Sequence, residues 1–214
     1  LVLSWIKENQ TIKTFNTYNE ISRIIDDEET SVYRKDFEFD MDIQSSKMTY
    51  SFKVKTTSSD NKENLLKEWK YRLFLELAFT SMNPQYEKWM SENRIHDYFG
   101  YDVEINHEYG YLMFYGENED KDDFINLIHE GLQTNIIEFE GFFERLKRRY
   151  FAQLLRQFDD QDDYAITLIR SQFSHVNITD SINCLKEVNF SDLLSIKDEI
   201  LGMDTAFVKM NHKR

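Results

Sequence analysis

The sequence contains few of the residues on which several classes of protein depend. Its 214 residues include one cysteine, six glycines and one proline. The single cysteine, Cys184, excludes an internal disulfide framework and any zinc site built from several thiolates. So few glycines leave little material for glycine-rich phosphate loops. No apolar run approaches the roughly eighteen residues that a membrane-spanning helix requires.

Basic charge is also scarce. Lys and Arg total 26 against 39 Asp and Glu, which gives a net charge of −13. This balance argues against a surface that follows nucleic-acid phosphates or anionic lipids. We therefore expect neither nucleic acid nor a membrane span in its function. Because no charged-then-apolar leader opens the chain, we expect a cytoplasmic protein, and because Leu1 lies inside a helical pattern, we expect part of a longer one.

The first half of the sequence predicts a helix, a linker and two strands. Apolar residues at Leu3, Ile6 and Phe15 indicate the end of a helix whose partners lie upstream. Residues 16–36 are polar and acidic, which is typical of a solvated linker. Residues 37–43 and 48–54 each alternate with period two, so they predict two strands that form a hairpin.

The rest of the sequence is mostly helical. The pattern predicts a long helix capped by Asp60, a second helix after Pro84, strands at 98–105 and 109–115, several helices, and a closing strand at 205–210. Strands joined by short turns are antiparallel, and helices in a block cover one face of a sheet. The predicted fold class is therefore α+β, a two-layer sandwich of a mainly antiparallel sheet with a helical layer.

No motif in the sequence completes an active site. The segment from His129 to Gln133 resembles a zinc-protease helix, but Gln133 stands where the second histidine is required. The acidic run 159–163 lacks the Gly and Glu of a calcium-binding loop at the required positions. From the residues alone we expect an α+β domain that holds no metal and no cofactor.

Several segments resemble the insulinase/pitrilysin family of zinc metallopeptidases. They read WIKENQ (5–10), YEKWMSEN (86–93), HEYGYLMFYG (107–116) and FERLKRR (143–149). The element order agrees with this family, and the resemblance covers nearly the whole chain. It is strongest to the second, C-terminal repeat of the bacterial two-repeat members, which belong to the processing-peptidase-like branch.

The resemblance implies an architecture and a set of partners. Residues 1–36 would be the trailing helix and acidic linker of a preceding repeat, and residues 37–214 a second α+β repeat. Two repeats in tandem form one half of a clamp, and a second half, homo- or hetero-dimeric, closes a chamber in which an unfolded peptide is cleaved. The zinc ion, bound by His-x-x-Glu-His, would lie in the upstream repeat or in the partner. The peptide would add as a strand to a sheet edge.

The resemblance also implies two site residues, Arg94 and Tyr101, which have the spacing of an Arg and a Tyr that reach the substrate in second repeats. Arg94 would hold a peptide carbonyl, and Tyr101 would stabilise the oxyanion. A different register, anchored on residues 86–92, puts Met90 and His96 at these positions instead. A further alternative gives Arg94 and Tyr101 purely structural roles at a helix end and in a strand.

Two other functions remain open at the level of sequence. The chain is compatible with a domain of a catalytically inactive peptidase-like subunit that acts as a partner or scaffold. Without the resemblance, it is an acidic interaction domain. A His-x-x-Glu-His motif in the upstream sequence would favour the peptidase.

Overall fold

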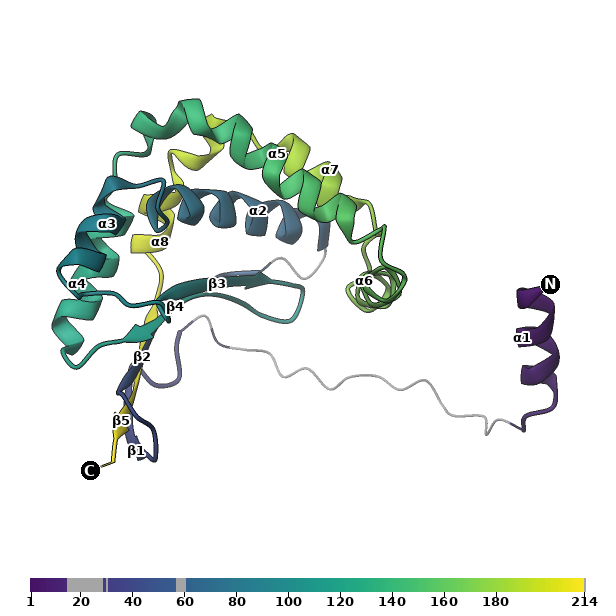
Figure 1. The fold of residues 1–214 in the computed structure, drawn as a ribbon, viewed down its shortest axis with the longest axis horizontal. Helices are drawn as coiled ribbons and strands as arrows, with labels where there is room; N and C mark the ends of the chain where they lie inside the picture. The colour runs from purple at the N-terminus through teal and green to yellow at the C-terminus, as the bar shows by residue number, and fades with distance from the viewer. Residues whose placement is uncertain (15–28, 30, 57–60, 214) are drawn as a thin grey trace.

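The computed structural model describes residues 1–14, 29, 31–56 and 61–213. A five-stranded sheet carries its helices on one face (Figure 1). The strands are β1 (Asp36–Met41), β2 (Lys47–Lys53), β3 (Gly100–Ile105), β4 (Gly110–Glu117) and β5 (Thr205–His212). The helices are α1 (Val2–Thr11), α2 (Asn61–Ala78), α3 (Pro84–Ser91), α4 (Lys121–Leu132), η1 (Ile136–Phe139), α5 (Glu140–Arg156), α6 (Gln161–Phe173), α7 (Asp180–Glu187), η2 (Phe190–Leu193) and α8 (Ile196–Leu201). The predicted α+β two-layer sandwich is confirmed.

The strand order is β1-β5-β2-β4-β3. Three neighbouring pairs are antiparallel, and β1 runs parallel to β5. The predicted β3–β4 hairpin is confirmed. The predicted hairpin of β1 with β2 is wrong, because the C-terminal strand β5 lies between them. Period-two alternation identifies a strand but not its neighbour, and β2 pairs with β4 at one edge and with β5 at the other.

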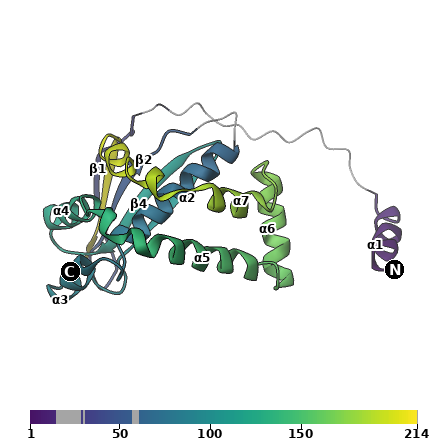
Figure 2. The same ribbon diagram turned by 90° about the horizontal axis from the view of Figure 1, so that it is seen from above.

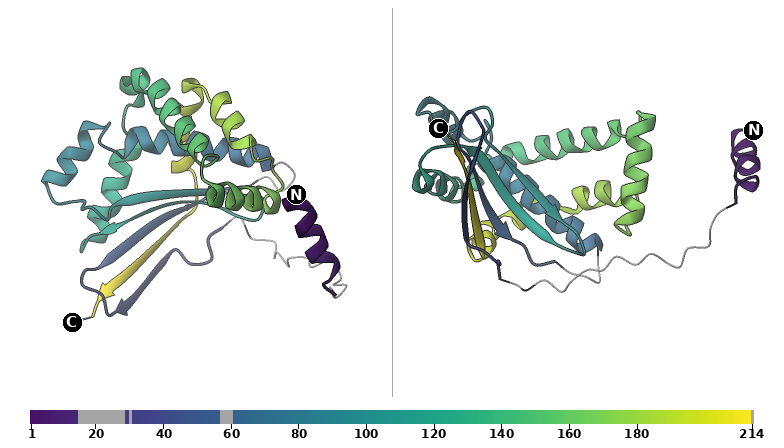
Figure 3. Two further views of the ribbon diagram at one scale, coloured as in Figure 1. Left: turned by 45° about the vertical axis from the view of Figure 1, so that its right-hand side comes forward. Right: turned by 90° about the horizontal axis from the view of Figure 1, so that it is seen from below.

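The two faces of the sheet differ in burial. On the helix-covered face, β2, β4, β3 and β5 contribute buried side chains: Met48, Tyr50, Phe52, Leu112, Phe114, Val103, Ile105 and Phe207. The sheet twists strongly between its β1 and β3 ends, and the helices stay on one side of it (Figure 3). The other face, here called the open face, is not covered by any described helix. Alternation along the strands therefore separates a core face from a surface that a ligand or partner can reach.

Helix α2 is the centre of the helical layer. Half of its 18 residues are buried, and they pack over the sheet. Asn83 begins the next helix, α3, by accepting a hydrogen bond from the backbone N–H of Gln85 at 3.0 Å, with Pro84 in the first turn. Asp120 caps α4 in the same manner through the N–H groups of Asp122 and Asp123. Such caps satisfy the amides that a helix leaves unpaired at its start.

Two helices lie apart from this packed core. Helix α6 runs across the ends of α5 and α7 (Figure 2), and none of its residues is buried. Helix α1 confirms the predicted N-terminal helix, and it too has no buried residue. Most of the predicted acidic linker, residues 16–28, and the predicted cap Asp60 lie outside the described residues.

Candidate functional site

Arg94 lies just beyond α3, after Asn93, whose φ of 56° turns the chain. Its guanidinium donates to Glu130 through two nitrogens, at 2.8 and 3.2 Å. A third nitrogen, Nε, donates to Asp123 Oδ1 at 2.8 Å. The two carboxylates belong to α4, so Arg94 joins the segment before β3 to that helix. The hydrogen bonds to Glu130 raise the pKa of Arg94 above its ordinary value and lower the pKa of Glu130.

Tyr101 lies on β3 and points into the helical layer rather than onto the open face. Its hydroxyl donates to Glu76 of α2 at 2.6 Å. The same carboxylate accepts from Tyr150 of α5 at 2.8 Å and forms an ion pair with Arg149. Glu76, Tyr101, Arg149 and Tyr150 therefore form one polar cluster, here called the Glu76 cluster. It joins three elements through a carboxylate that is almost fully buried.

The charge of Glu76 controls the electrostatics of this cluster. Burial by itself would raise its pKa, but the hydrogen bonds from Tyr101, Arg149 and Tyr150 outweigh burial and hold the pKa below its ordinary value. Burial and the adjacent carboxylate raise the pKa of Tyr150 to about 12 and that of Tyr101 further still. Glu76 is thus ionised and both tyrosines are protonated donors at neutral pH.

The structure does not bring Arg94 and Tyr101 to a common partner. Arg94 is bound to carboxylates of α4, whereas Tyr101 is bound to a carboxylate of α2. Met90 and His96, the residues of the alternative register, are exposed. The contacts of Arg94 and Tyr101 are those of residues that hold elements together, and a role in substrate contact stays a prediction.

The side chains on the open face change from apolar at the β1 edge to aromatic and acidic at the β3 edge. At the β1 edge, Phe37 and Phe39 are paired in register with Val208 and Met210 of β5, so these apolar side chains share the open face. Farther across, β4 contributes Met113, Tyr111 and Tyr115, and β3 contributes carboxylates. Apolar and aromatic side chains on an uncovered sheet face form a surface suited to a protein or peptide.

A group of tyrosines and carboxylates lies on this face at the end of the β3–β4 hairpin. Tyr111 donates to Asp102 at 3.1 Å and to Glu104 at 3.2 Å. Tyr109 donates to Glu104 at 2.7 Å, and its ring stacks on that of Tyr111 with centroids 6.1 Å apart. Partial burial and the neighbouring Asp102 raise the pKa of Tyr111. The sequence analysis did not single out these residues, although alternation along both strands places them on one face.

The two edges of the sheet are not equally open. On β3, the carbonyl of Val103 accepts from Arg72 of α2 at 3.0 Å, and Ile105 hydrogen-bonds Glu68 of the same helix through its backbone. At the other edge, β1 pairs with β5, and no further strand among the described residues lies beside it. An added strand therefore has more unpaired backbone available at β1 than at β3.

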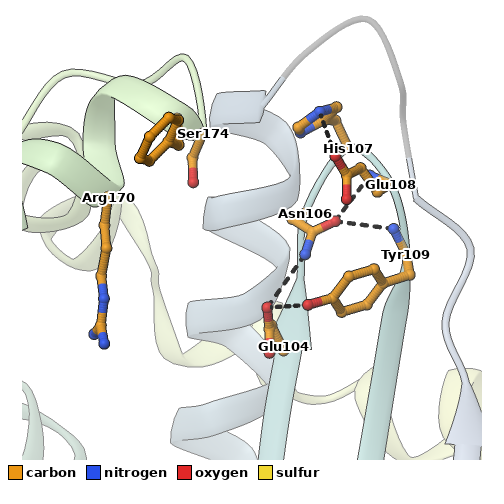
Figure 4. A pocket seen from close by; sticks show the side chains of 8 residues that line it. Glu104, Asn106, His107, Glu108, Tyr109, Arg170 and Ser174 are labelled. Atoms are coloured by element: carbon orange, nitrogen blue, oxygen red, sulfur yellow. Dashed lines mark hydrogen bonds and ion pairs between the residues drawn. The ribbon is translucent and has the colours of Figure 1, made fainter. Parts of the chain in front are cut away.

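A cavity of about 500 Å³ separates the hairpin from α6 (Figure 4). Asn106 shapes the hairpin end by accepting from the N–H groups of Glu108 and Tyr109, at 2.8 and 2.9 Å. Across the gap, α6 contributes Arg170 and the following turn contributes Ser174. The hairpin groups are hydrogen-bonded mainly to one another, except that the buried Nδ1 of His107 has no hydrogen-bond partner among the described residues.

The described residues do not fit a metal site. Among them, no group of three or more His, Cys, Asp or Glu side chains could hold an ion. In the segment that resembles a zinc-protease helix, Glu130 is bound to Arg94 and accepts from Trp89 at 3.1 Å. Asp160, in the acidic run, caps α6. Glu130 and Asp160 thus have structural partners in the chain. In the same described part, no helix is long and apolar enough to cross a bilayer.

The fold of this chain is similar to that of solved structures described as M16-like or insulinase-family peptidases. The structure of an M16-like peptidase from Alicyclobacillus acidocaldarius matches with a TM-score of 0.81 at 16% identity, over 98% of this chain and 51% of that one. The first half of the periplasmic protease PqqL from Escherichia coli matches with a TM-score of 0.68 at 12% identity, over 99% of this chain and 48% of that one.

In sequence, the chain is similar to a Bacillus subtilis protein named uncharacterized zinc protease YmfH. The two are 24% identical over 205 residues, which are 95% of this chain and 48% of YmfH. No protein-family model matches the sequence. The chain therefore spans about half the length of the curated relative that it matches.

Proposed function

We propose that this chain is the second, non-zinc-binding repeat of a zinc endopeptidase and forms part of the chamber that binds an unfolded peptide. The observation that carries the proposal is the similarity of nearly the whole chain to half of a protein named a zinc protease. The other half has the length of one more repeat. The zinc ion would be bound there or in a partner chain, since the described residues here hold no fitting ligand set.

The open face supports this role because it offers apolar contacts and backbone hydrogen bonds, which do not depend on the amino-acid sequence of the bound peptide. Its apolar side chains on β1 and β5 would bind apolar peptide side chains, and the Tyr109–Tyr111 stack would pack against others. The backbone of β1 would hydrogen-bond an extended segment. The open face would thus bind an unfolded peptide while the zinc-binding repeat cleaves it.

The experiment is a cleavage assay on the parent protein with an unfolded model peptide. We expect cleavage that a zinc chelator abolishes and that added Zn²⁺ restores. The isolated 214-residue chain should not cleave the peptide. A parent protein that binds no zinc and cleaves nothing would contradict the proposal and favour the inactive partner or scaffold subunit.

A further inference from the structure

Helix α6 presents its apolar side chains to solvent. Ile166, Ile169 and Phe173 follow one another at intervals of three and four residues, so they form one stripe along the helix. Their exposed fractions are 48%, 55% and 70%. Single exposed apolar residues are common on proteins, but a whole stripe on one helix marks a contact surface.

The residues of α6 that face α2, α5 and α7 are polar. Thr167, Ser171 and Ser174 line a groove of about 420 Å³ between α6 and helices α2, α5 and α7. A surface helix of a complete globular protein has the reverse arrangement, with its apolar stripe inward. Ile166, Ile169 and Phe173 do not line this groove, although Phe173 also lines the cavity beside the β3–β4 hairpin. The stripe therefore leaves apolar surface on α6 that no described element buries.

The charge near α6 indicates what kind of surface covers the stripe. Its first turn contains Asp162 and Asp163, and Asp160 caps it. Arg170 is the one basic residue between Gln161 and Phe173. Helices that lie on membranes carry Lys and Arg along the polar face to attract anionic lipid. An acidic helix with an apolar stripe is suited to another protein surface instead.

The length of the relatives indicates which protein surface this is. Trp5 and Ile6 of α1 are 60% and 51% exposed, so this helix also lacks a cover for its apolar residues. The relatives are about twice as long as this chain, so a domain of similar size is available to contact both helices.

We propose that the stripe of Ile166, Ile169 and Phe173 is the surface on which the other half of the parent chain packs. This inference rests on the proposed function, because it takes the chain to be one repeat of a longer peptidase. It assigns α6 to the contact between repeats rather than to the peptide chamber.

The test uses the full parent protein with a specific protease site inserted between Ser31 and Lys35. After cleavage, the two halves should co-elute in size-exclusion chromatography. The I169D/F173D variant should weaken their association at least tenfold, so that the halves elute separately. The matched control is L194D/L201D, which places two aspartates at residues that are 49% and 37% exposed on a different part of the helical layer. It should leave the halves together.

Two readouts decide between the outcomes. Circular dichroism of the variant half should show native helix content and melting, because both replaced residues are exposed. Variant halves that co-elute as tightly as wild type would overturn the proposal, as would wild-type halves that separate. If the variant instead separated a dimer of the parent protein while the two cleaved halves still co-eluted, the proposal would be overturned, and the stripe would be the contact with a second copy of the chain. Failure of the proposed function would be seen separately, as a parent without zinc or cleavage whose halves still respond to the variant.

Discussion

At the residue scale, the Glu76 cluster is the main polar feature of the interior. One buried carboxylate accepts from Tyr101, Tyr150 and Arg149, which come from β3 and α5. Removing one donor leaves part of a buried charge unsatisfied, which costs more than the bond itself contributes.

Replacing Tyr101 by Phe tests this cluster. Because the hydroxyl donates to an ionised group, we expect the free energy of unfolding to fall by about 1.5–3 kcal/mol. Chemical denaturation measures the change. The control is Tyr33→Phe at a fully exposed position, which should change stability by less than about 0.5 kcal/mol. Equal effects in the two variants would contradict the structural role.

If the parent protein is the peptidase proposed above, the same variant separates the two roles of Tyr101. A structural residue lowers stability while the folded enzyme keeps its turnover. A strong loss of turnover in a fully folded Tyr101→Phe enzyme would instead support the oxyanion contact that the resemblance implies.

The ionisation of Glu76 predicts a dependence of stability on pH. Its pKa in the folded chain lies below its ordinary value of 4.5. The stabilisation from this carboxylate is therefore fully present above that value and is lost as pH falls through the folded-state pKa. We expect the stability difference between wild type and Glu76→Gln to shrink between about pH 6 and 3.

Denaturation curves at several pH values measure that difference. Glu144→Gln, at an exposed position of α5, serves as the control and should give a small, constant difference. A Glu76→Gln difference that grows on acidification would contradict the assignment of Glu76 as the ionised acceptor.

At the element scale, most helices and strands could be predicted from the sequence, but one pairing could not. Alternation predicted β1 and β2, and the 3- and 4-residue spacing predicted α2, α4, α5 and α6. The partner of β1 depends on β5, more than 160 residues later, and local patterns carry no information about such a contact. The Glu76 cluster was missed for the same reason, because its members come from distant segments.

The packing of α4 against Phe79, the residue that follows α2, depends on the absence of a side chain at Gly131. A Cβ at this position would lie 2.2 Å from the ring of Phe79. Gly131→Ala should therefore overpack the core and lower the free energy of unfolding by about 1–3 kcal/mol. Thermal or chemical denaturation measures the change.

Gly141 is the matched control, since a Cβ there meets nothing within 4 Å. Gly141→Ala in α5 should leave stability unchanged or raise it by up to about 1 kcal/mol through helix propensity. If Gly131→Ala also stabilised the chain, the close approach of α4 to Phe79 would be contradicted.

At the scale of the whole molecule, the chain has the features of one part of a larger assembly. Its sheet has an open face with apolar and tyrosine-rich regions, and α1 and α6 present apolar residues outward. The sequence predicted a domain without its own metal ligands, and the comparisons relate it to half of longer chains. The substrate contacts of Arg94 and Tyr101 were implied by the family resemblance and stay a prediction, because the structure shows their hydrogen bonds within the chain but no bound peptide.

The most direct test of the proposed function is the zinc content of two purified proteins, the parent and the 214-residue chain. The account predicts about one zinc ion per parent chain, or per partner chain where the metal site lies there, and none on the 214-residue chain. One equivalent of tightly bound zinc on the 214-residue chain alone would contradict it.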